Sequence, residues 1–193
     1  MTTETARTRT VAGREVPPAG TWDIDGSHSS VQFTARHMMF AKVHGQFRAW
    51  NAELNYDAQN PTNSSVVVQV DTSSIDTREE KRDAHLRSAD FFDAEKYPRM
   101  TFRSRNVEST GKGTYKLTGD LTIRDVTRPV TLAVEQTGAG KDPWGNDRLG
   151  FTASAAISRA EWGLKWNQAL EAGGVLVSDK IEIGVEVQVL QAR

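Results

Sequence analysis

The chain has 193 residues, of which 37% are hydrophobic and 25% are charged, and this composition is ordinary for one globular domain. A formal net charge of −1 gives no global attraction to nucleic acid or to an anionic bilayer. The sequence contains no cysteine, which excludes disulfides, thiolate metal sites and cysteine nucleophiles.

The first 20 residues contain no apolar run long enough for the core of a signal peptide. We therefore expect residues 1–20 to form a flexible N-terminal tail, residues 21–193 to form one domain, and the protein to be cytoplasmic. No later segment approaches the roughly 20 apolar residues of a membrane span, so no stable membrane insertion is expected.

From Trp22 onward, apolar and polar residues alternate with a period of two, which is typical of strands with one buried and one solvated face. Such segments begin near residues 22, 31, 43, 66, 100, 115, 130, 149 and 181. The apolar phase slips between Ala49 and Ala52, and a β-bulge near Trp50 and Asn51 explains the slip. Short turn segments rich in Gly, Pro and Asp separate the strands, which favours antiparallel neighbours. The sequence thus predicts eight or nine antiparallel strands.

One segment between the strands has helical character. Thr77 and Glu80 form a capping box, and residues 78–88 are rich in charged helix formers. Residues 90–97 follow, with the adjacent aromatic pair Phe91 and Phe92. We expect this second stretch to be a plug at one barrel end or, alternatively, a movable lid. Because adjacent helical residues point about 100° apart, only one ring faces the interior squarely, and Phe92 is the expected one.

A sheet of about eight long antiparallel strands, each with one apolar face, hides that face by closing into a barrel. Small inward residues such as Gly45, Ala49 and Gly119 then leave a hollow lumen or, in the alternative, relieve crowding between coiled strands around a filled core. The inward phase and the expected cover together predict the ligand-binding residues, which are Val31, Phe33, Ala35, His37, Phe40, Gly45, Phe47, Phe92, Phe102, Leu121, Phe151, Ala153, Ala155 and Ile183.

The sequence offers little catalytic chemistry. It has no phosphate-binding loop, dinucleotide fingerprint, nucleophile elbow or HExxH helix. His28, His37, His44 and His85 have opposed placements, so no metal site is expected. Only His37 falls on an inward strand phase, where its imidazole contacts a ligand head group or is satisfied by a neighbouring strand or a trapped water. We expect no catalytic residue, no metal and no cofactor.

Several stretches, spread over nearly everything after residue 20, together resemble one known family. They are Trp22–Asp25 with His28 and Ser29, Phe33–His37, Val43–Phe47, Thr77–Pro98, Leu121–Val130, and Ser158–Arg159 with Trp162–Leu164. The sequence is similar to the YceI-like proteins, a lipocalin-like group of bacterial polyisoprenoid-binding proteins. This resemblance implies an all-β, eight-stranded antiparallel lipocalin-like barrel with a helical insertion between strands. It also implies a long isoprenoid or similar lipid in the lumen, a homodimer, and no established enzymatic activity.

The leading hypothesis is non-catalytic binding, transport or storage of an elongated apolar ligand, such as a polyisoprenoid or an isoprenoid quinone. Each buried methylene contributes about 0.8 kcal/mol, so affinity depends on chain length more than on the head group. Two alternatives stay open. One is an enzyme that uses His37 and a carboxylate at the barrel mouth, such as Asp25, on an apolar substrate; the other is a stress-linked interaction module with a filled core.

Overall fold

A computed structural model describes residues 9–11, 14–16, 20–57, 59–171 and 173–191. The strands are β1 (Arg9–Val11), β2 (Arg14–Val16), β3 (Gly20–Ile24), β4 (Ser30–His37), β5 (Ala41–Phe47), β6 (Trp50–Tyr56), β7 (Ser65–Asp71), β8 (Ile75–Asp76), β9 (Arg99–Gly111), β10 (Thr114–Ile123), β11 (Val126–Lys141), β12 (Asp147–Ser158) and β13 (Lys180–Gln191). The α-helix is α1 (Glu80–Arg87), and the 3₁₀ turns are η1 (Gly26–His28), η2 (Pro61–Asn63), η3 (Thr72–Ser74) and η4 (Arg159–Trp162).

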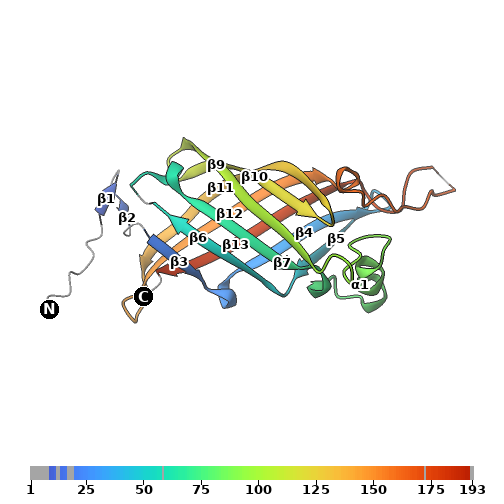
Figure 1. Cartoon of the computed structure of the whole chain (residues 1–193), viewed down its shortest axis with the longest axis horizontal. Helices are drawn as coiled ribbons and strands as arrows, with labels where there is room; N and C mark the ends of the chain where they lie inside the picture. The colour runs from blue at the N-terminus through green and yellow to red at the C-terminus, as the bar shows by residue number, and fades with distance from the viewer. Residues whose placement is uncertain (1–8, 12–13, 17–19, 58, 172, 192–193) are drawn as a thin grey trace.

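The strands close into an antiparallel barrel with eight strand positions (Figure 1). Three positions are each built from two successive segments: β3 with β4, β5 with β6, and β7 with β8. Strand positions that follow one another in the chain are hydrogen-bonded neighbours, and β13 closes the circle by pairing with β12 on one side and with β3 and β4 on the other. The predicted eight-stranded barrel with a helical insertion is confirmed.

Part of the expected tail is structured, because β1 and β2 pair as antiparallel strands with Arg9 opposite Val16. The rest of residues 1–19 lies outside the described residues. None of the helices in the described part of the chain is long and apolar enough to cross a membrane.

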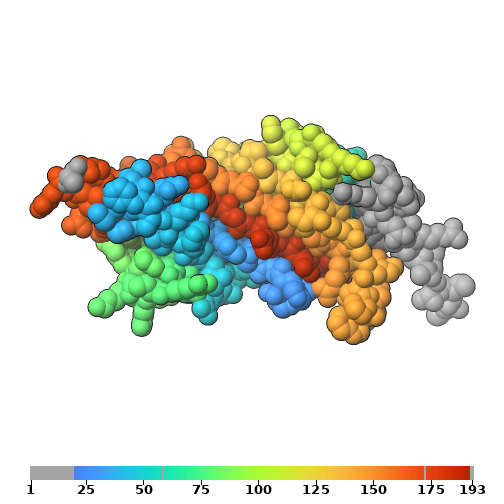
Figure 2. Space-filling view, turned by 180° about the vertical axis from the view of Figure 1, so that it is seen from behind, coloured from blue at the N-terminus to red at the C-terminus, as the bar shows by residue number. Residues whose placement is uncertain are grey.

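The two barrel ends are built differently. At one end, which we call the helix end, α1 and the turn between β4 and β5 gather near the segment from Gly163 to Ser178 (Figure 2). The carbonyl of Leu176 accepts a hydrogen bond from the Met38 backbone at 2.8 Å, which joins the turn to that segment. At the other end, which we call the β3 end, β3, the β6–β7 loop and the turn between β9 and β10 come together (Figure 1).

The strand position formed by β5 and β6 contains an irregularity, as predicted, but it lies two residues earlier than the predicted bulge. The chain bends at Arg48 and Ala49, and β6 has already begun at Trp50. The Arg48 backbone donates to the carbonyl of Ser74, and its guanidinium donates to Asp76 at 2.6 Å. Ala49 is exposed on this bend, so the expectation that it faces inward is wrong.

Two strands extend well beyond their alternating segments because each contains a β-bulge. The register between β9 and β10 skips Arg105, so the inward phase changes parity and both Phe102 and Val107 face the interior. The register between β11 and β12 likewise skips Thr137. At a bulge the alternation of apolar and polar residues is broken, although the backbone hydrogen bonds between the strands continue. The strands predicted from the alternation are therefore shorter than those in the structure.

The helix forms where predicted, but its cap is different. The backbone turns at Arg78, where φ is 62°, and the side chain of Glu79 then accepts hydrogen bonds from the first turn of α1. Thr77, the predicted capping residue, instead donates its backbone N–H and its hydroxyl to the buried carboxylate of Asp83, at 2.9 and 2.5 Å. The capping interaction therefore begins two residues later than the capping box indicates.

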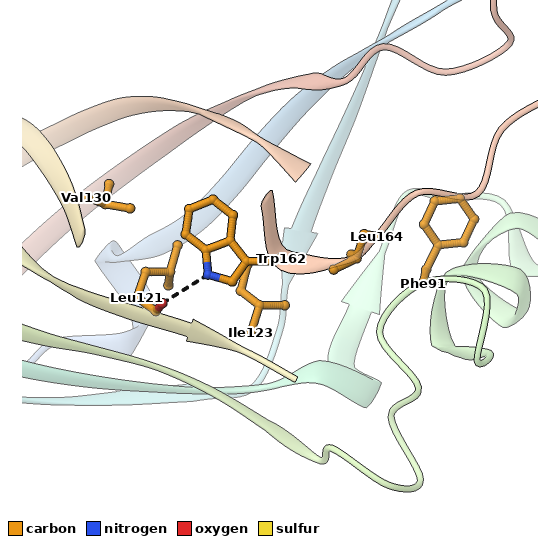
Figure 3. Packing of buried hydrophobic residues seen from close by; sticks show 6 residues of the cluster. All are labelled: Phe91, Leu121, Ile123, Val130, Trp162 and Leu164. Carbon is orange, nitrogen blue, oxygen red and sulfur yellow. Dashed lines mark hydrogen bonds between the residues drawn. The ribbon is translucent and has the colours of Figure 1, made fainter. Parts of the chain in front are cut away.

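A packed apolar cluster closes the helix end of the barrel. Its buried members are Phe91, Leu121, Ile123, Val130, Trp162 and Leu164 (Figure 3). The indole N–H of Trp162 donates to the Leu121 carbonyl at 3.0 Å, which ties η4 to β10. This cluster contains residues from β10, β11, η4 and the segment after α1, so it holds the cover and the wall together.

Two inward glycines accommodate aromatic rings instead of opening the lumen. The ring of Phe33 lies over Gly45 on the paired strand, and the ring of Phe102 lies over Gly119. A methyl group at Gly119 would meet Phe102 Cζ and the Arg103 carbonyl, each at 2.5 Å. At these two positions glycine relieves crowding, as the filled-core alternative expected, although the barrel as a whole keeps a cavity.

We predict that Gly119→Ala lowers the free energy of unfolding by about 1–3 kcal/mol, because the backbone contact with Arg103 cannot move aside. Gly184→Ala is the matched control on a central strand, since a methyl group there meets nothing within 4 Å. The control stays within about 0.5 kcal/mol of the natural protein or becomes more stable. Urea unfolding measures both variants, and equal stability of the two would contradict this account of Gly119.

Candidate ligand-binding cavity

A cavity of about 340 Å³ lies inside the barrel, and every one of the eight strand positions contributes to its wall. Its volume falls within the roughly 300–1,000 Å³ of small-molecule sites. The middle of the wall is aliphatic, because the apolar, inward-facing residues of neighbouring strands lie side by side there. Examples from five strands are Val68, Leu117, Leu132, Ala153 and Val185. The barrel is hollow, as the leading hypothesis requires.

Most of the predicted ligand-binding residues line this cavity. They are Val31, Phe33, Ala35, Phe47, Phe92, Phe102, Leu121, Phe151, Ala153 and Ile183. The period-two pattern placed all of them except Phe92 correctly, because each lies on a regular, inward-facing stretch of strand, whereas Phe92 lies in the segment after α1. The structure brings them together around one space, and binding of a ligand by them stays a prediction.

His37 and Phe40 lie outside the cavity, which corrects their predicted placement. His37 is the last residue of β4, where it forms a bridge with Val177, and its side chain is exposed. Phe40 is 81% exposed in the turn that follows. The β4–β5 hairpin runs past the rim of the barrel, so the inward phase of β4 has no interior left to face at His37.

Gly45 and Ala155 belong to the wall without lining the cavity. Gly45 is buried beneath the ring of Phe33. Ala155, which pairs with Ile183, packs against the cluster at the helix end. Larger side chains cover both residues, so neither contributes a surface to the lumen.

Arg159 is a cavity residue that the alternating pattern could not reveal, because it lies in η4 and not in a strand. Its side chain is buried, and its guanidinium donates to the carbonyls of Leu164, Trp166, Val177 and Ser178 at 2.5–3.4 Å. Burial lowers the pKa of the guanidinium. These bonds hold the segment from Leu164 to Ser178 against the helix end, so Arg159 organises the cover.

The segment after α1, residues 90–97, forms a plug that backbone hydrogen bonds hold in place. Backbone hydrogen bonds of 2.8–3.0 Å join Phe91, Phe92 and Asp93 to Leu86 and Ser88. Both phenylalanines line the cavity, in contrast to the expectation that only one ring faces it. They differ in packing: Phe91 is 5% exposed inside the apolar cluster, whereas Phe92 is only half-buried and meets Phe47 edge to face at 5.7 Å.

The β3 end of the cavity contains aromatic residues with polar groups. Tyr56 packs edge to face against Trp22 and Phe151, with ring centroids 6.3 and 5.7 Å apart. Burial raises the pKa of Tyr56 to about 12, and burial also raises the pKa of Tyr115. Both tyrosines line the cavity. The alternating pattern places both tyrosines in the inward phase of β6 and β10, but it carries no signal about their hydroxyl groups.

A network of charged groups lies outside the lumen near the same end. Asp25 accepts hydrogen bonds from Ser27, His28 and Arg148, at 2.6, 2.9 and 2.6 Å. The Ser27 hydroxyl, followed by Arg148 and His28, holds the pKa of the Asp25 carboxyl well below its usual range. Arg148 also donates to Asp142 at 2.9 Å, so the network joins the kink between β3 and β4 to β12.

This network does not have the geometry of a catalytic triad. Ser27 and Asp25 both contact the same imidazole nitrogen of His28, Nδ1, whereas a triad needs nucleophile and carboxylate on opposite nitrogens. The pair required by the enzyme alternative is also separated, because Asp25 precedes β4 and His37 is its last residue, and the eight residues of β4 span roughly 25 Å. Within the described residues, no three His, Cys, Asp or Glu side chains are placed to hold a metal ion.

We predict that Phe91→Ala and Phe92→Ala have different consequences. Phe91→Ala should lower the free energy of unfolding by about 3–5 kcal/mol, because it leaves a hole in a packed cluster. Phe92→Ala should cost less stability and should accelerate release of an apolar molecule such as retinol from the lumen. Stopped-flow fluorescence and urea unfolding measure the two effects. If neither variant changed the release rate, the segment would be a static plug.

The comparisons with known proteins agree with this architecture. A UPF0312 protein from Vibrio cholerae is 41% identical over 143 residues, which cover 74% of this chain and 76% of the relative. Another from Ectopseudomonas mendocina is 42% identical over 135 residues, covering 70% and 71%. Among solved structures, the Campylobacter jejuni YceI protein is 28% identical with a TM-score of 0.73, covering 82% of this chain and 90% of that protein.

A more distant structural neighbour is described as a polyisoprenoid binding domain from Saccharophagus degradans. It is 13% identical, with a TM-score of 0.62, and the match covers 89% of this chain and 98% of that domain. At this identity the likeness shows the fold alone. The model of the YceI-like domain family matches residues 22–189, which is nearly the whole barrel. The chain therefore belongs to the YceI-like family.

Proposed function

We propose that this protein binds one elongated apolar molecule, of the polyisoprenoid class, inside its barrel and carries or stores it without chemical change. The observation that carries the proposal is the cavity itself, whose wall is contributed by all eight strand positions and is aliphatic or aromatic over most of its length. A closed sheet offers no lateral opening, so a long ligand must lie along the barrel axis.

The energetics favour a hydrocarbon chain as the ligand. Each methylene transferred from water contributes about 0.8 kcal/mol, so one five-carbon isoprene unit contributes up to roughly 4 kcal/mol before the costs of association. Among the described residues that line the lumen, the one charged side chain is Arg159 at the helix end, so the middle of the lumen offers no charged partner to a ligand. A polar or charged ligand would lose its hydration there without gaining partners, which makes an apolar chain the favoured occupant.

The comparisons support the same class of ligand. The Saccharophagus degradans neighbour with the same fold is described as a polyisoprenoid binding domain. An isoprenoid quinone is one candidate within this class, and a homodimer is the assembly that the family resemblance favours. Sedimentation velocity of the purified protein tests directly whether it is a dimer.

The two alternatives are less well supported by the structure. A filled core conflicts with the cavity, although Phe33 and Phe102 fill the space over two glycines. An enzyme that uses His37 and Asp25 conflicts with the separation of these residues along β4. We therefore propose binding without catalysis.

We predict that Ala153→Trp blocks the lumen and weakens binding of retinol, an isoprenoid alcohol, by at least about tenfold. Ala153 lines the middle of the cavity, opposite Val134 on β11 and Val185 on β13. Ala156→Trp is the matched control, because Ala156 lies on the same strand with its side chain exposed. Fluorescence titration of retinol measures affinity, and circular dichroism confirms that each variant is folded.

Undiminished retinol binding by folded Ala153→Trp, or an equal loss in both variants, would contradict binding in the lumen. If Ala153→Trp does not fold, Ala153→Leu takes its place, because leucine fills less of the lumen than tryptophan does. It should still weaken binding relative to the natural protein, because the lumen becomes narrower at the same point.

A further inference from the structure

Three side chains at the β3 end carry hydrogen-bond donors for which the described residues supply no acceptor. Trp22 and Tyr56 are 1% and 5% exposed, and their rings are in contact. Tyr115 is half-buried and lies close enough to Tyr56 for their hydroxyl groups to interact electrostatically. Tyr56 and Tyr115 line the lumen, so their side chains border the space that a ligand would occupy.

Within the described part of the chain, none of these donors has a hydrogen-bond partner. The indole N–H of Trp22 is buried without an acceptor. The hydroxyl groups of Tyr56 and Tyr115 form no hydrogen bond with any described residue. A fully buried donor without a partner costs roughly 1–3 kcal/mol, which applies to the Trp22 indole, whereas the tyrosine hydroxyls are not fully buried and belong to side chains that border the lumen. Donors without an acceptor beside an apolar lumen indicate that a ligand atom accepts their hydrogen bonds.

The helix end of the lumen has the opposite character. Its polar lining residue, Arg159, already donates to four backbone carbonyls. The buried Nε of Arg124, in the turn between β10 and β11, also lacks an acceptor among the described residues, but Arg124 does not line the lumen. The surrounding surface is aromatic or aliphatic, with Phe91, Phe92 and Leu164. A ligand therefore finds free hydrogen-bonding capacity at the β3 end and apolar packing at the helix end.

The charge near the β3 end restricts the kind of head group. Asp57 follows Tyr56 directly, and its carboxylate accepts hydrogen bonds from the backbone of Gln59 and Asn60, each at 2.9 Å. These bonds hold the pKa of Asp57 below its usual range, with Asn60 as the largest cause. The carboxylate is ionised at neutral pH and acts electrostatically on Tyr56. An anionic head group beside Tyr56 would be repelled.

We infer that the β3 end binds the polar head of the ligand and that this head is a neutral oxygen group, a hydroxyl or a carbonyl, held by Tyr56 and Tyr115. The inference rests on the proposed function, since it assumes an apolar chain in the lumen. It specifies the substrate class as isoprenoid alcohols and carbonyl compounds, in preference to isoprenyl phosphates or bare hydrocarbons. The chain then extends from the β3 end towards Phe91 and Phe92.

The test compares farnesol, farnesyl phosphate and farnesene, which share one isoprenoid chain and differ in the head. Each competes with retinol for the natural protein and for Tyr56→Phe, Tyr115→Phe and the double variant. Tyr97→Phe is the matched control, because Tyr97 lies in the plug at the helix end. Phenylalanine keeps the ring and its packing, so the variants change only the hydroxyl groups, and thermal unfolding checks that they stay folded.

We expect the natural protein to bind farnesol most tightly and farnesyl phosphate most weakly. Tyr56→Phe should weaken farnesol binding about three- to tenfold and leave farnesene unchanged, because one hydrogen bond is lost. The double variant should bind farnesol and farnesene alike, and Tyr97→Phe should match the natural protein for all three compounds.

Two results would overturn the inference while the proposed function stands. One is equal weakening of farnesol and farnesene in Tyr56→Phe, which would assign the residue a packing role. The other is tightest binding of farnesyl phosphate by the natural protein. If neither retinol nor any of the three compounds bound to the natural protein, the proposed function would be overturned and the inference with it.

Discussion

Closure of the sheet through β13 is the constraint on which the rest of the structure depends. This strand pairs with β12 along one edge and with β3 and β4 along the other, so the sheet closes on itself and unpaired edges are confined to short segments such as β8. Once the sheet is closed, the inward phase of every strand faces one shared interior. Side-chain size then decides whether that interior is full: Phe33 and Phe102 occupy the space over two glycines, while Ala35 and Ala153 leave room beside them.

The two ends of the barrel follow from the elements that interrupt the strands. At the helix end, Arg159 and Trp162 donate to backbone carbonyls and thereby attach the cover to the wall. At the β3 end, the charged network around Asp25 stabilises the kink outside the lumen, while Tyr56 and Tyr115, whose hydroxyl groups have no partner among the described residues, line it. One end is therefore a packed apolar cover and the other a polar terminus, which gives the cavity a direction along which an amphiphilic molecule can be oriented.

The residues of regular strands could be predicted from the sequence, because alternation reports which face is buried. Val31, Phe47 and Ile183 are examples. Prediction failed where the backbone leaves that regularity. The bulge at Arg105 reverses the phase of β9, and the hairpin containing His37 continues beyond the rim. Arg159 acts through carbonyls of a segment that has no periodic pattern, so only its place in a family motif could have indicated it.

The central claim is that the closed barrel holds one apolar molecule and releases it unchanged. Native mass spectrometry of the freshly purified protein, repeated after incubation with a total bacterial lipid extract, tests it most directly. We predict one added mass per chain, lost on extraction into organic solvent and recovered there as an intact neutral lipid. The mass of the bare chain in both experiments, or recovery of a chemically altered product, would contradict the account.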